Sequence, residues 1–466
     1  MATIAFWGAA RTVTGSKYLL DTGKSRVLID CGVFQGLKQL RERNWADPPF
    51  DVRILNSVLL THAHIDHSGY LPRLVRHGYR GPVYCSRGTA DLLKILLPDA
   101  GRLQEEEADY RNRHNKTKHS PALPLYTEDD AMAALKLIVP VKNSGEPIKV
   151  SSDIFAEFRV AGHILGSSTV KVRLASRIEG AQETTVLFSG DLGRYDQPII
   201  RDPEPPPACD YLLIESTYGD RPHDPEAPKD ALARIITKAV ERNGPILIPA
   251  FAVGRTQEIL YLIRELEDEK RIPVLPVCVD SPMAAAATTA YGARKEEQDA
   301  DYVAILAKAQ HPLRTHAMMT CSSRQESKRL NDATGPRLII SASGMMTGGR
   351  VLHHALRMVP DANATIVFVG YQAEGTLGRR ILNREAEVKI LGEWVPVRCD
   401  VEKIGGFSAH ADWEEVLRWL QDLPAPPRRT FVTHGELGSA NAMAEHIRNK
   451  FGWDVVVPDY GERFDL

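Results

Sequence analysis

The stretch Thr61-His62-Ala63-His64-Ile65-Asp66-His67-Ser68-Gly69 places three imidazoles and a carboxylate within six residues. It follows the apolar run Val58-Leu59-Leu60, which predicts a buried strand, so the polar groups begin where that strand ends. In an extended segment His62 and His64 point to the same side of the backbone. A turn into a helix at Asp66-His67 would bring two further ligand atoms to the same place. This set of nitrogen and oxygen ligands suits zinc best.

Length and composition restrict the class of protein. A chain of 466 residues exceeds a typical single domain and predicts two compact units. The net charge of −2 provides no general attraction to polyanions, so any nucleic-acid binding must come from a local surface. The six cysteines are scattered without a CxxC pair, which favours reduced thiols in a cytoplasmic protein. Apolar runs stay short of 18 residues, and Arg11 and Lys17 interrupt the N-terminal segment, so we expect neither a membrane span nor a signal peptide.

The first part of the chain reads as strands that end in polar groups. Short apolar runs separated by turn residues predict a strand meander over residues 1–30, and Asp30 closes its third strand. A carboxylate there can accept the second ring N–H of a metal-bound histidine. His163 stands between small residues after another strand, and the apolar run Val186-Leu187-Phe188 ends at Asp191. Each of these groups, taken alone, could equally be a turn residue. Residues 89–137 are helix-like.

The proline-rich segment 202–207 marks a change of rhythm. Four prolines in five residues fit neither a helix nor a central strand, so we expect a linker there. Beyond it, apolar strands alternate with helices, of which the clearest covers residues 257–267. This alternation predicts a parallel α/β sheet. The expected strands are residues 245–249, 274–279, 337–340 and 364–369.

The histidine cluster, with its H-x-H-x-D-H spacing, resembles the metallo-β-lactamase superfamily. Asp30, His163 and Asp191 stand at the places of that superfamily's first, third and fourth motifs. Three later segments narrow the resemblance to the β-CASP nucleases, in particular the nuclease subunit of cleavage-and-polyadenylation specificity factor and its compact prokaryotic relatives. These segments match motifs A, B and C of that family: Glu215-Ser216-Thr217-Tyr218-Gly219, Gly406-Phe407-Ser408-Ala409-His410 and Thr433-His434-Gly435-Glu436.

This resemblance implies a fold and an activity. The fold is an α/β architecture in which a parallel α/β (β-CASP) domain is inserted into a metallo-β-lactamase αββα sandwich. The expected division is residues 1–207 and 397–466 for the sandwich and 208–396 for the insertion. The activity is that of a zinc-dependent ribonuclease of RNA processing or decay. It would hydrolyse single-stranded RNA by a two-metal mechanism in the cleft between the two domains.

The resemblance also implies a set of site residues. One zinc ion would be held by His62, His64 and His163, and a second by Asp66, His67 and His434, with Asp191 bridging. Asp66 would also take part in catalysis, and His410 would donate a proton to the leaving 3′-oxygen while Glu215 holds it. Asp30 would support the ligands from behind. The Gly-rich loop after the strand at 337–340 could offer phosphate contacts at Ser341, Ser343 and Gly344. Arg255 and Arg379 could add two more, although either arginine could equally form a surface salt bridge.

Two alternative functions remain at this stage, a DNA-acting nuclease and a non-catalytic RNA-binding scaffold. Family members that act on RNA have histidine in motif C, which DNA-acting members tend to lack, so His434 favours RNA. A non-catalytic RNA-binding scaffold would have lost ligands, whereas every ligand position here is filled. The sequence leaves open whether cutting is internal or proceeds from the 5′ end, and whether the chain forms a homo-oligomer.

Overall fold

The computed structural model of the protein describes residues 2–114, 117, 119–175, 183–308 and 311–466. Contacts between residues divide the chain into two compact units. Unit 1 consists of Met1–Pro222 and His410–Leu466, and unit 2 is the intervening segment His223–Ala409.

Unit 1 contains two seven-stranded sheets. The first has the order β22-β1-β2-β3-β4-β5-β6 and the second the order β21-β20-β11-β10-β9-β8-β7. The strands of the first sheet are β1 (Thr3–Phe6), β2 (Tyr18–Asp21), β3 (Arg26–Ile29), β4 (Ser57–Leu59), β5 (Val83–Ser86), β6 (Ile138–Val141) and β22 (Arg463–Asp465). Those of the second are β7 (Ile148–Lys149), β8 (Ile154–Val160), β9 (Ser168–Leu174), β10 (Thr184–Phe188), β11 (Tyr211–Glu215), β20 (Arg429–Thr433) and β21 (Val455–Val456).

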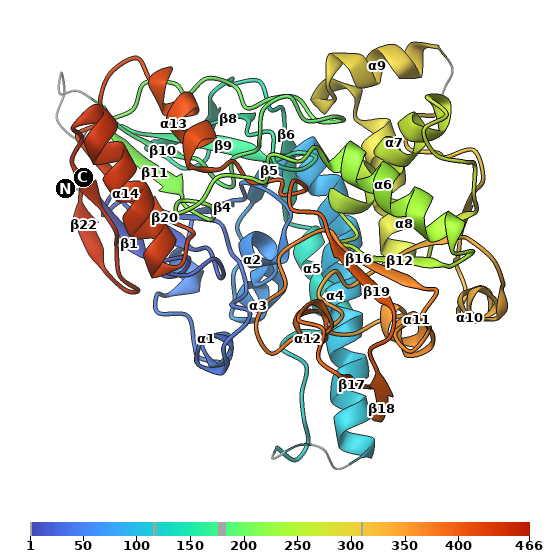
Figure 1. Ribbon diagram of the computed structural model, residues 1–466. Coiled ribbons are helices and arrows are strands. Elements are labelled where there is room, and N and C mark those ends of the chain that lie inside the picture. The colour runs from blue at the N-terminus through green and yellow to red at the C-terminus, as the bar shows by residue number, and fades with distance from the viewer. Residues whose placement is uncertain (1, 115–116, 118, 176–182, 309–310) are drawn as a thin grey trace. The chain divides into compact units, whose positions relative to one another are not determined.

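Helices cover the outer side of each sheet in unit 1. The apolar faces of α13 and α14 pack on the second sheet through Trp419, Met443 and Ile447, and α4 contacts β5 and β6 of the first sheet. Unit 1 is therefore an αββα sandwich (Figure 1). Its helices are α1 (Lys38–Glu42), the 3₁₀ turn η1 (Val52–Ile54), α2 (Ile65–Ser68), α3 (Leu71–Arg76), α4 (Arg87–Arg113), α5 (Glu128–Leu135), α13 (Trp413–Gln421) and α14 (Leu437–Phe451).

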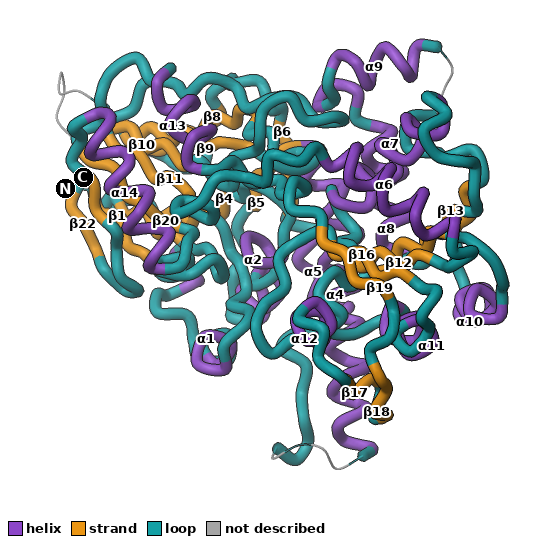
Figure 2. Tube along the Cα trace, viewed as in Figure 1, coloured by secondary structure: helices purple, strands orange, loops and turns teal. Residues whose placement is uncertain are grey.

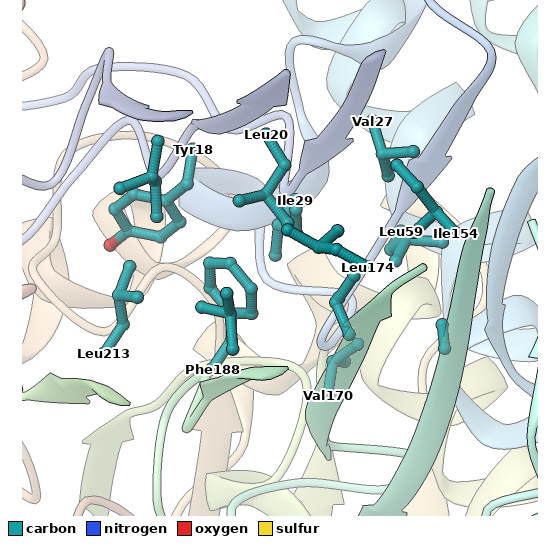
Figure 3. Close-up of a cluster of buried hydrophobic side chains, with 14 of the residues drawn as sticks. Tyr18, Leu20, Val27, Ile29, Leu59, Ile154, Val170, Leu174, Phe188 and Leu213 are labelled. Carbon is teal, nitrogen blue, oxygen red and sulfur yellow. The ribbon is translucent and has the colours of Figure 1, made fainter. Parts of the chain in front are cut away.

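The main core of unit 1 lies between its two sheets. Figure 3 shows Leu20, Ile29 and Leu59 from the first sheet facing Val170 and Phe188 from the second. Alternate residues of β8 are buried along its whole length, as a strand with one face on a core requires. Burying a valine, leucine, isoleucine or phenylalanine side chain in this core contributes about 1.5–3 kcal/mol. This core fixes the strand ends at which the polar motifs stand.

Unit 2 contains one parallel sheet with the order β14-β13-β15-β12-β16-β19. The antiparallel hairpin β17-β18 forms a second, separate sheet. Its strands are β12 (Ile246–Pro249), β13 (Val277–Val279), β14 (Met318–Thr320), β15 (Leu338–Ser341), β16 (Thr365–Phe368), β17 (Glu387–Ile390), β18 (Glu393–Pro396) and β19 (Asp400–Lys403). Its helices are α6 (Pro228–Glu241), α7 (Arg255–Asp268), α8 (Pro282–Ala293), η2 (Lys295–Glu297), α9 (Ala300–Ala307), α10 (Arg324–Asp332), α11 (Val351–Met358) and α12 (Leu377–Leu382).

Helices and strands alternate along unit 2 (Figure 2). A buried cluster joins β12, β15 and β16 to α11, α12 and the hairpin on one side of the sheet. Figure 1 shows α6, α7 and α8 on its other side. All six strands run parallel, so their carboxyl ends and the loops that follow them gather at one edge.

Several expectations from the sequence can be compared with these elements. The meander over residues 1–30 is confirmed by the antiparallel pairs β1-β2 and β2-β3, and the helix over 257–267 by α7. The helix-like segment 89–137 forms two helices, α4 and α5, because Thr127 caps a new helix with its side chain. Residues 115, 116 and 118 of that segment lie outside the described residues.

The compact units differ at their edges from the expected division at 207/208 and 396/397. β11 pairs with β10 and β20 in unit 1, although it follows the proline-rich segment. β19 pairs with β16 in unit 2, although it follows residue 396. Pairing in a sheet, which the sequence does not display, decides to which unit each of these strands belongs.

Two observations concern the chain as a whole. Among the described residues, none of the helices combines the length and the hydropathy that crossing a membrane would need. All six cysteines carry free thiols, and five of them are buried.

Candidate metal centre

The histidine stretch connects β4 to the short helix α2. The strand ends at Leu59, and the helix begins at Ile65, so Asp66 and His67 lie on its single turn, as the sequence predicts. The cluster is held from below by backbone hydrogen bonds, in which Ser16 N–H donates to the carbonyl of Asp66 (2.8 Å) and Cys31 N–H to that of His67 (2.7 Å). The local geometry therefore comes from three separate segments of unit 1.

The first ligand group consists of His62, His64 and His163. His64 Nδ1 lies 3.1 Å from His62 Nε2 and 3.2 Å from His163 Nε2. His163 comes from the loop between β8 and β9, where Ser167 Oγ accepts a hydrogen bond from the His163 N–H (2.8 Å). Folding thus brings a residue about a hundred positions away to the histidine pair.

The second ligand group consists of Asp66, His67 and His434. His67 Nε2 lies 3.0 Å from His434 Nε2, and Asp66 Oδ2 lies 3.6 Å from the same nitrogen of His434. His434 follows β20 with a positive φ of 48° and is fixed by a hydrogen bond from its N–H to the carbonyl of Ala9 (2.7 Å). A Cβ at the next residue, Gly435, would lie 2.2 Å from Ser216 Oγ, so the motif requires glycine there.

Asp191, at the end of β10, lies between the two groups. Its Oδ2 is 3.4 Å from His62 Nε2 and 3.6 Å from His163 Nε2. Its Oδ1 is 3.2 Å from His67 Nε2 and 3.4 Å from His434 Nδ1. Each carboxylate oxygen therefore faces one of the two groups.

The separations fit metal ions at both groups. A tetrahedral zinc ion with nitrogen ligands at 2.0–2.1 Å keeps those ligands about 3.3–3.4 Å apart. The nitrogen pairs here are separated by 3.0–3.2 Å, and in each group the ligand atoms all lie within 4.8 Å of one another. Asp191 Oδ1 is buried, and no described residue donates a hydrogen bond to it. Such crowding of nitrogen and oxygen lone pairs is unfavourable unless cations lie between them.

The atoms behind the ligands are also organised. Asp30, on a positive φ of 58° at the end of β3, lies 2.7 Å from His67 Nδ1, which directs Nε2 of that ring to the ligand group. Thr61 donates its hydroxyl to Asp30 and lies 3.1 Å from His62 Nδ1. Thr217 Oγ1 lies 3.2 Å from His434 Nδ1. Neither Thr61 nor Thr217 was expected in the site from the sequence, although both stand inside the quoted motifs.

The charges of the cluster shift its pKa values. Burial lowers the pKa of His62 and of His64, which keeps both rings neutral and able to donate lone pairs. Burial opposes the charge of Asp66, but a hydrogen bond from His434 and the charge of His67 outweigh it and bring the pKa of Asp66 to about 2. The pKa of Asp191 lies well below its usual value, because the surrounding histidines outweigh its burial. Both carboxylates are thus ionised.

Glu215 and His410 form a pair beside the ligand groups. Both oxygens of Glu215 lie 3.2 Å from His410 Nδ1, and Glu215 also accepts backbone N–H bonds from Leu192 (2.7 Å) and Thr217 (3.3 Å). Burial acts to lower the pKa of His410, but the charges of Glu215 and Asp191 raise it to about 9, above the ordinary histidine value that the sequence suggested. The His410 side chain is 21% exposed, whereas those of the buried ligands His62, His67 and His163 are 0–2% exposed.

Two of the expected phosphate contacts in unit 2 are engaged within the fold. Arg255 NH1 forms an ion pair with Glu258 (2.6 Å), and its guanidinium lies over the Phe407 ring. Ser341 is buried and donates its hydroxyl to the carbonyl of Asp280 (3.1 Å). These side chains therefore support the loops of unit 2.

The other three residues lie in loops at the carboxyl edge of the unit 2 sheet. Ser343 Oγ accepts the N–H of Thr347 (3.0 Å) and so closes the Gly-rich loop on itself. Gly344 lies against the side chain of Phe251. Arg379, in α12, has a buried Nε without a hydrogen-bond partner among the described residues.

Known proteins resemble the chain in both parts. Residues 25–242 match the beta-lactamase superfamily domain, residues 256–381 the Beta-Casp domain, and residues 394–458 the Zn-dependent metallo-hydrolase RNA specificity domain. A protein of Thermus thermophilus named as a ribonuclease is 39% identical over 458 residues, covering 98% of each chain. The transcription termination factor FttA of Methanocaldococcus jannaschii is 31% identical over 98% of this chain and 70% of its own length.

Among solved structures, a protein of unknown function from Enterococcus faecalis has a TM-score of 0.55 at 14% identity over the full length of both chains, which concerns the fold alone. The αββα sandwich with its histidine and aspartate cluster defines a metallo-β-lactamase enzyme. With its inserted parallel domain and the full-length relatives above, the chain belongs to the β-CASP family of that superfamily.

Proposed function

We propose that the chain is a ribonuclease that hydrolyses RNA phosphodiester bonds with two zinc ions. His62, His64 and His163 hold one ion, and Asp66, His67 and His434 hold the other, with Asp191 shared. The observation that carries this proposal is the position of Asp191, whose two oxygens each face one ligand group at 3.2–3.6 Å. A carboxylate placed in this way serves a pair of cations better than a single one.

The relatives support RNA as the substrate. One is named as a ribonuclease, and the family matched by residues 394–458 is described as an RNA specificity domain. Every ligand position expected from the motifs is occupied by a ligating residue, including His434 in motif C. This argues against a scaffold that has lost its metals, and it favours RNA over DNA.

The ligand cluster would hold two cations for hydrolysis. When bound, such cations activate a water and offset the charge of the phosphate in the transition state. Asp66 is ionised, and its side chain is 23% exposed, so its carboxylate faces the accessible side of the cluster. There it can accept a hydrogen bond from the attacking water and orient it. The buried histidines and Asp191 hold the ligand atoms in place and exclude other water.

His410 supplies the second proton transfer. Because Glu215 engages Nδ1, the Nε2 atom of His410 is the one that can donate to the departing 3′-oxygen. Glu215 is itself fixed by two backbone N–H groups, so the ring is held in one orientation. Of the histidines in the cluster, His410 combines partial exposure with a carboxylate partner, as a general acid requires.

The test is cleavage of single-stranded RNA labelled either at its 5′ end or internally, with product lengths read on a gel. We expect metal-dependent products that disappear after chelation and return with added zinc. The two labels distinguish internal cutting from removal of nucleotides at the 5′ end. A single-stranded DNA of the same sequence is the matched control, and preference for the DNA would contradict the proposal. Intact RNA with the zinc-loaded protein would refute it.

A further inference from the structure

Two aromatic side chains are exposed at the carboxyl edge of the unit 2 sheet. Phe251 stands in the loop after β12 and is 48% exposed, and Tyr371 stands in the loop after β16 and is 56% exposed. β12 and β16 are paired neighbours in that sheet, so the two loops leave the same edge side by side. Exposed aromatic rings at adjoining positions leave apolar surface in water that a ligand could cover.

The loops hold both residues in place. A Cβ at Gly344 would lie 3.3 Å from the Phe251 ring, and one at Gly370 would lie 4.0 Å from it, so one side of the ring packs against two glycines. The Phe251 carbonyl accepts the hydroxyl of Thr256 (2.8 Å). Gln372, in the loop after β16, donates from its amide to the carbonyl of Gly344 in the loop after β15 (3.0 Å). Phe251 thus lies beside the residue that precedes Tyr371, on a backbone that is hydrogen-bonded across three loops.

Groups that could bind a phosphate backbone lie in the Gly-rich loop and in α12, at the same edge of the sheet as these rings. The backbone N–H groups of Gly344 and Met345 donate to no other described residue. The first turn of α12 contacts the same loop, since Gly378 N–H donates to the carbonyl of Met345 (3.3 Å). Next to Gly378, Arg379 forms no ion pair with a described carboxylate, and its Nε is buried without a partner. Aromatic rings, N–H donors and an arginine therefore share one edge.

We propose that Phe251 and Tyr371 form a stacking platform for the bases of single-stranded RNA. This inference rests on the proposed function and adds a substrate-binding site to it. Single-stranded nucleic acid alternates flat bases with phosphates, and proteins bind it without sequence preference through aromatic rings beside cationic groups. A protein partner would use the rings but would leave the N–H groups and Arg379 without a charged counterpart. The platform reads no base edges, so it tolerates any sequence.

The test compares intact RNA with an abasic RNA of the same length. All proteins carry His410→Ala so that binding is measured without cleavage. We expect Phe251→Ala and Tyr371→Ala each to weaken binding of intact RNA by about 5- to 150-fold. Binding of the abasic strand should change little, because it offers phosphates without bases. Tyr371→Phe keeps the ring and should retain affinity.

Trp394→Ala is the matched control, because Trp394 is an equally exposed aromatic of the same unit but lies on the β17-β18 hairpin. It should leave both affinities unchanged. Equal weakening on intact and abasic RNA would show that the rings act through the fold of the loops and would overturn stacking. Unchanged affinity in both alanine variants would overturn it as well and would indicate a protein partner for this surface.

Cleavage by the protein with His410 intact separates this inference from the proposed function. If that protein cuts RNA while both alanine variants keep its KM, only the platform is wrong. If it does not cut RNA at all, the proposed function fails, and the platform fails with it. A rise in KM with kcat retained in the variants supports both, because stacking remote from the reacting phosphate contributes to binding.

Discussion

The ligand cluster of unit 1 and the strand-end loops of unit 2 differ in how far their functional side chains are buried. In the cluster, Asp191 is buried among histidines and Asp30 is fully engaged behind them, so charge is concentrated and kept from water. At the edge of unit 2, Phe251 and Tyr371 are exposed and Arg379 lacks a carboxylate partner among the described residues. Chemistry needs a rigid and dehydrated arrangement, whereas holding a flexible chain needs surface.

The largest effect should come from Asp191→Ala, because this side chain faces both ligand groups. We expect both metal ions to be lost and activity to fall by more than the roughly 10²–10⁴-fold associated with a general acid. Metal analysis of the purified variant measures the first and RNA cleavage the second. His163→Ala should mainly empty one site. A variant of Asp191 that keeps two zinc ions would contradict the shared position.

His410→Ala should slow cleavage by roughly 10²–10⁴-fold while both metal ions and RNA binding remain. An RNA with sulfur in place of the leaving 3′-oxygen should recover most of this loss, since sulfur leaves without a proton. His446→Ala, which removes a histidine stacked on Trp413 outside the cluster, is the control. An equal defect on the sulfur substrate, or loss of zinc, would rule out the general-acid role.

The pH dependence of stability should report on Lys17, whose ammonium is buried beside the segments that carry the histidine cluster. Burial lowers the pKa of this lysine from 10.5 to about 8, and its ammonium donates to the carbonyl of Gly32 and lies 4.7 Å from the Tyr70 ring centre. Between pH 8 and 10.5 the unfolded chain keeps a proton that the folded chain has released, so stability should rise with pH.

Across this window the rise should be on the order of 3 kcal/mol, and Lys17→Met should lack it. Denaturant unfolding of both proteins at several pH values provides the comparison, and the other titrating groups cancel in the difference. Parallel pH profiles for the two proteins would mean that water reaches the ammonium.

Asp30→Asn should weaken metal binding by about 10- to 100-fold, because the amide no longer fixes the His67 ring as a carboxylate does. The expected loss is confined to the ion held by His67. Asp153→Asn is the control, since Asp153 is another buried aspartate of unit 1 that accepts from Thr22 (2.8 Å) away from the ligands. Zinc titration against a chelating indicator measures the zinc affinity of both variants. Equal zinc affinities in the two would show that Asp30 does not support the metal ligands.

The smallest effect is expected from Arg379, a single phosphate contact in unit 2. RNA affinity should fall with salt despite the net charge of −2, and log affinity loses about 0.7 per phosphate contact per log unit of salt. Arg379→Ala should reduce that slope by about one contact. Arg380→Ala is the matched control, because Arg380 is already paired with Glu385 (2.7 Å). Identical slopes in the two variants would exclude Arg379 from the phosphate path.

Much of the fold, and the gathering of histidines and aspartates after β4, could be predicted from the sequence, because both depend on local patterns. The spacing of His62, His64, Asp66 and His67 is set by one strand end and one helical turn. Apolar strands alternating with helices indicated the parallel sheet of unit 2. The assignment of β11 and β19 to their units could not be read in this way, because pairing partners lie far away in the chain.

What only the tertiary structure decided is the direction in which side chains face. The sequence placed Asp191 among the ligands by family resemblance. In the fold, β10 pairs with β11 and β11 pairs with β20, and the Asp191 that follows β10 directs one oxygen toward each histidine group. The sequence paired Glu215 with His410 by family resemblance alone, and the fold places a Glu215 oxygen 3.2 Å from His410 Nδ1 across 195 residues. It also offered Arg255 and Ser341 as phosphate contacts, whereas neighbours in the folded unit engage both. Residue type and spacing determine which functional groups the chain carries. The partners that each side chain meets after folding determine whether the group can still bind a ligand.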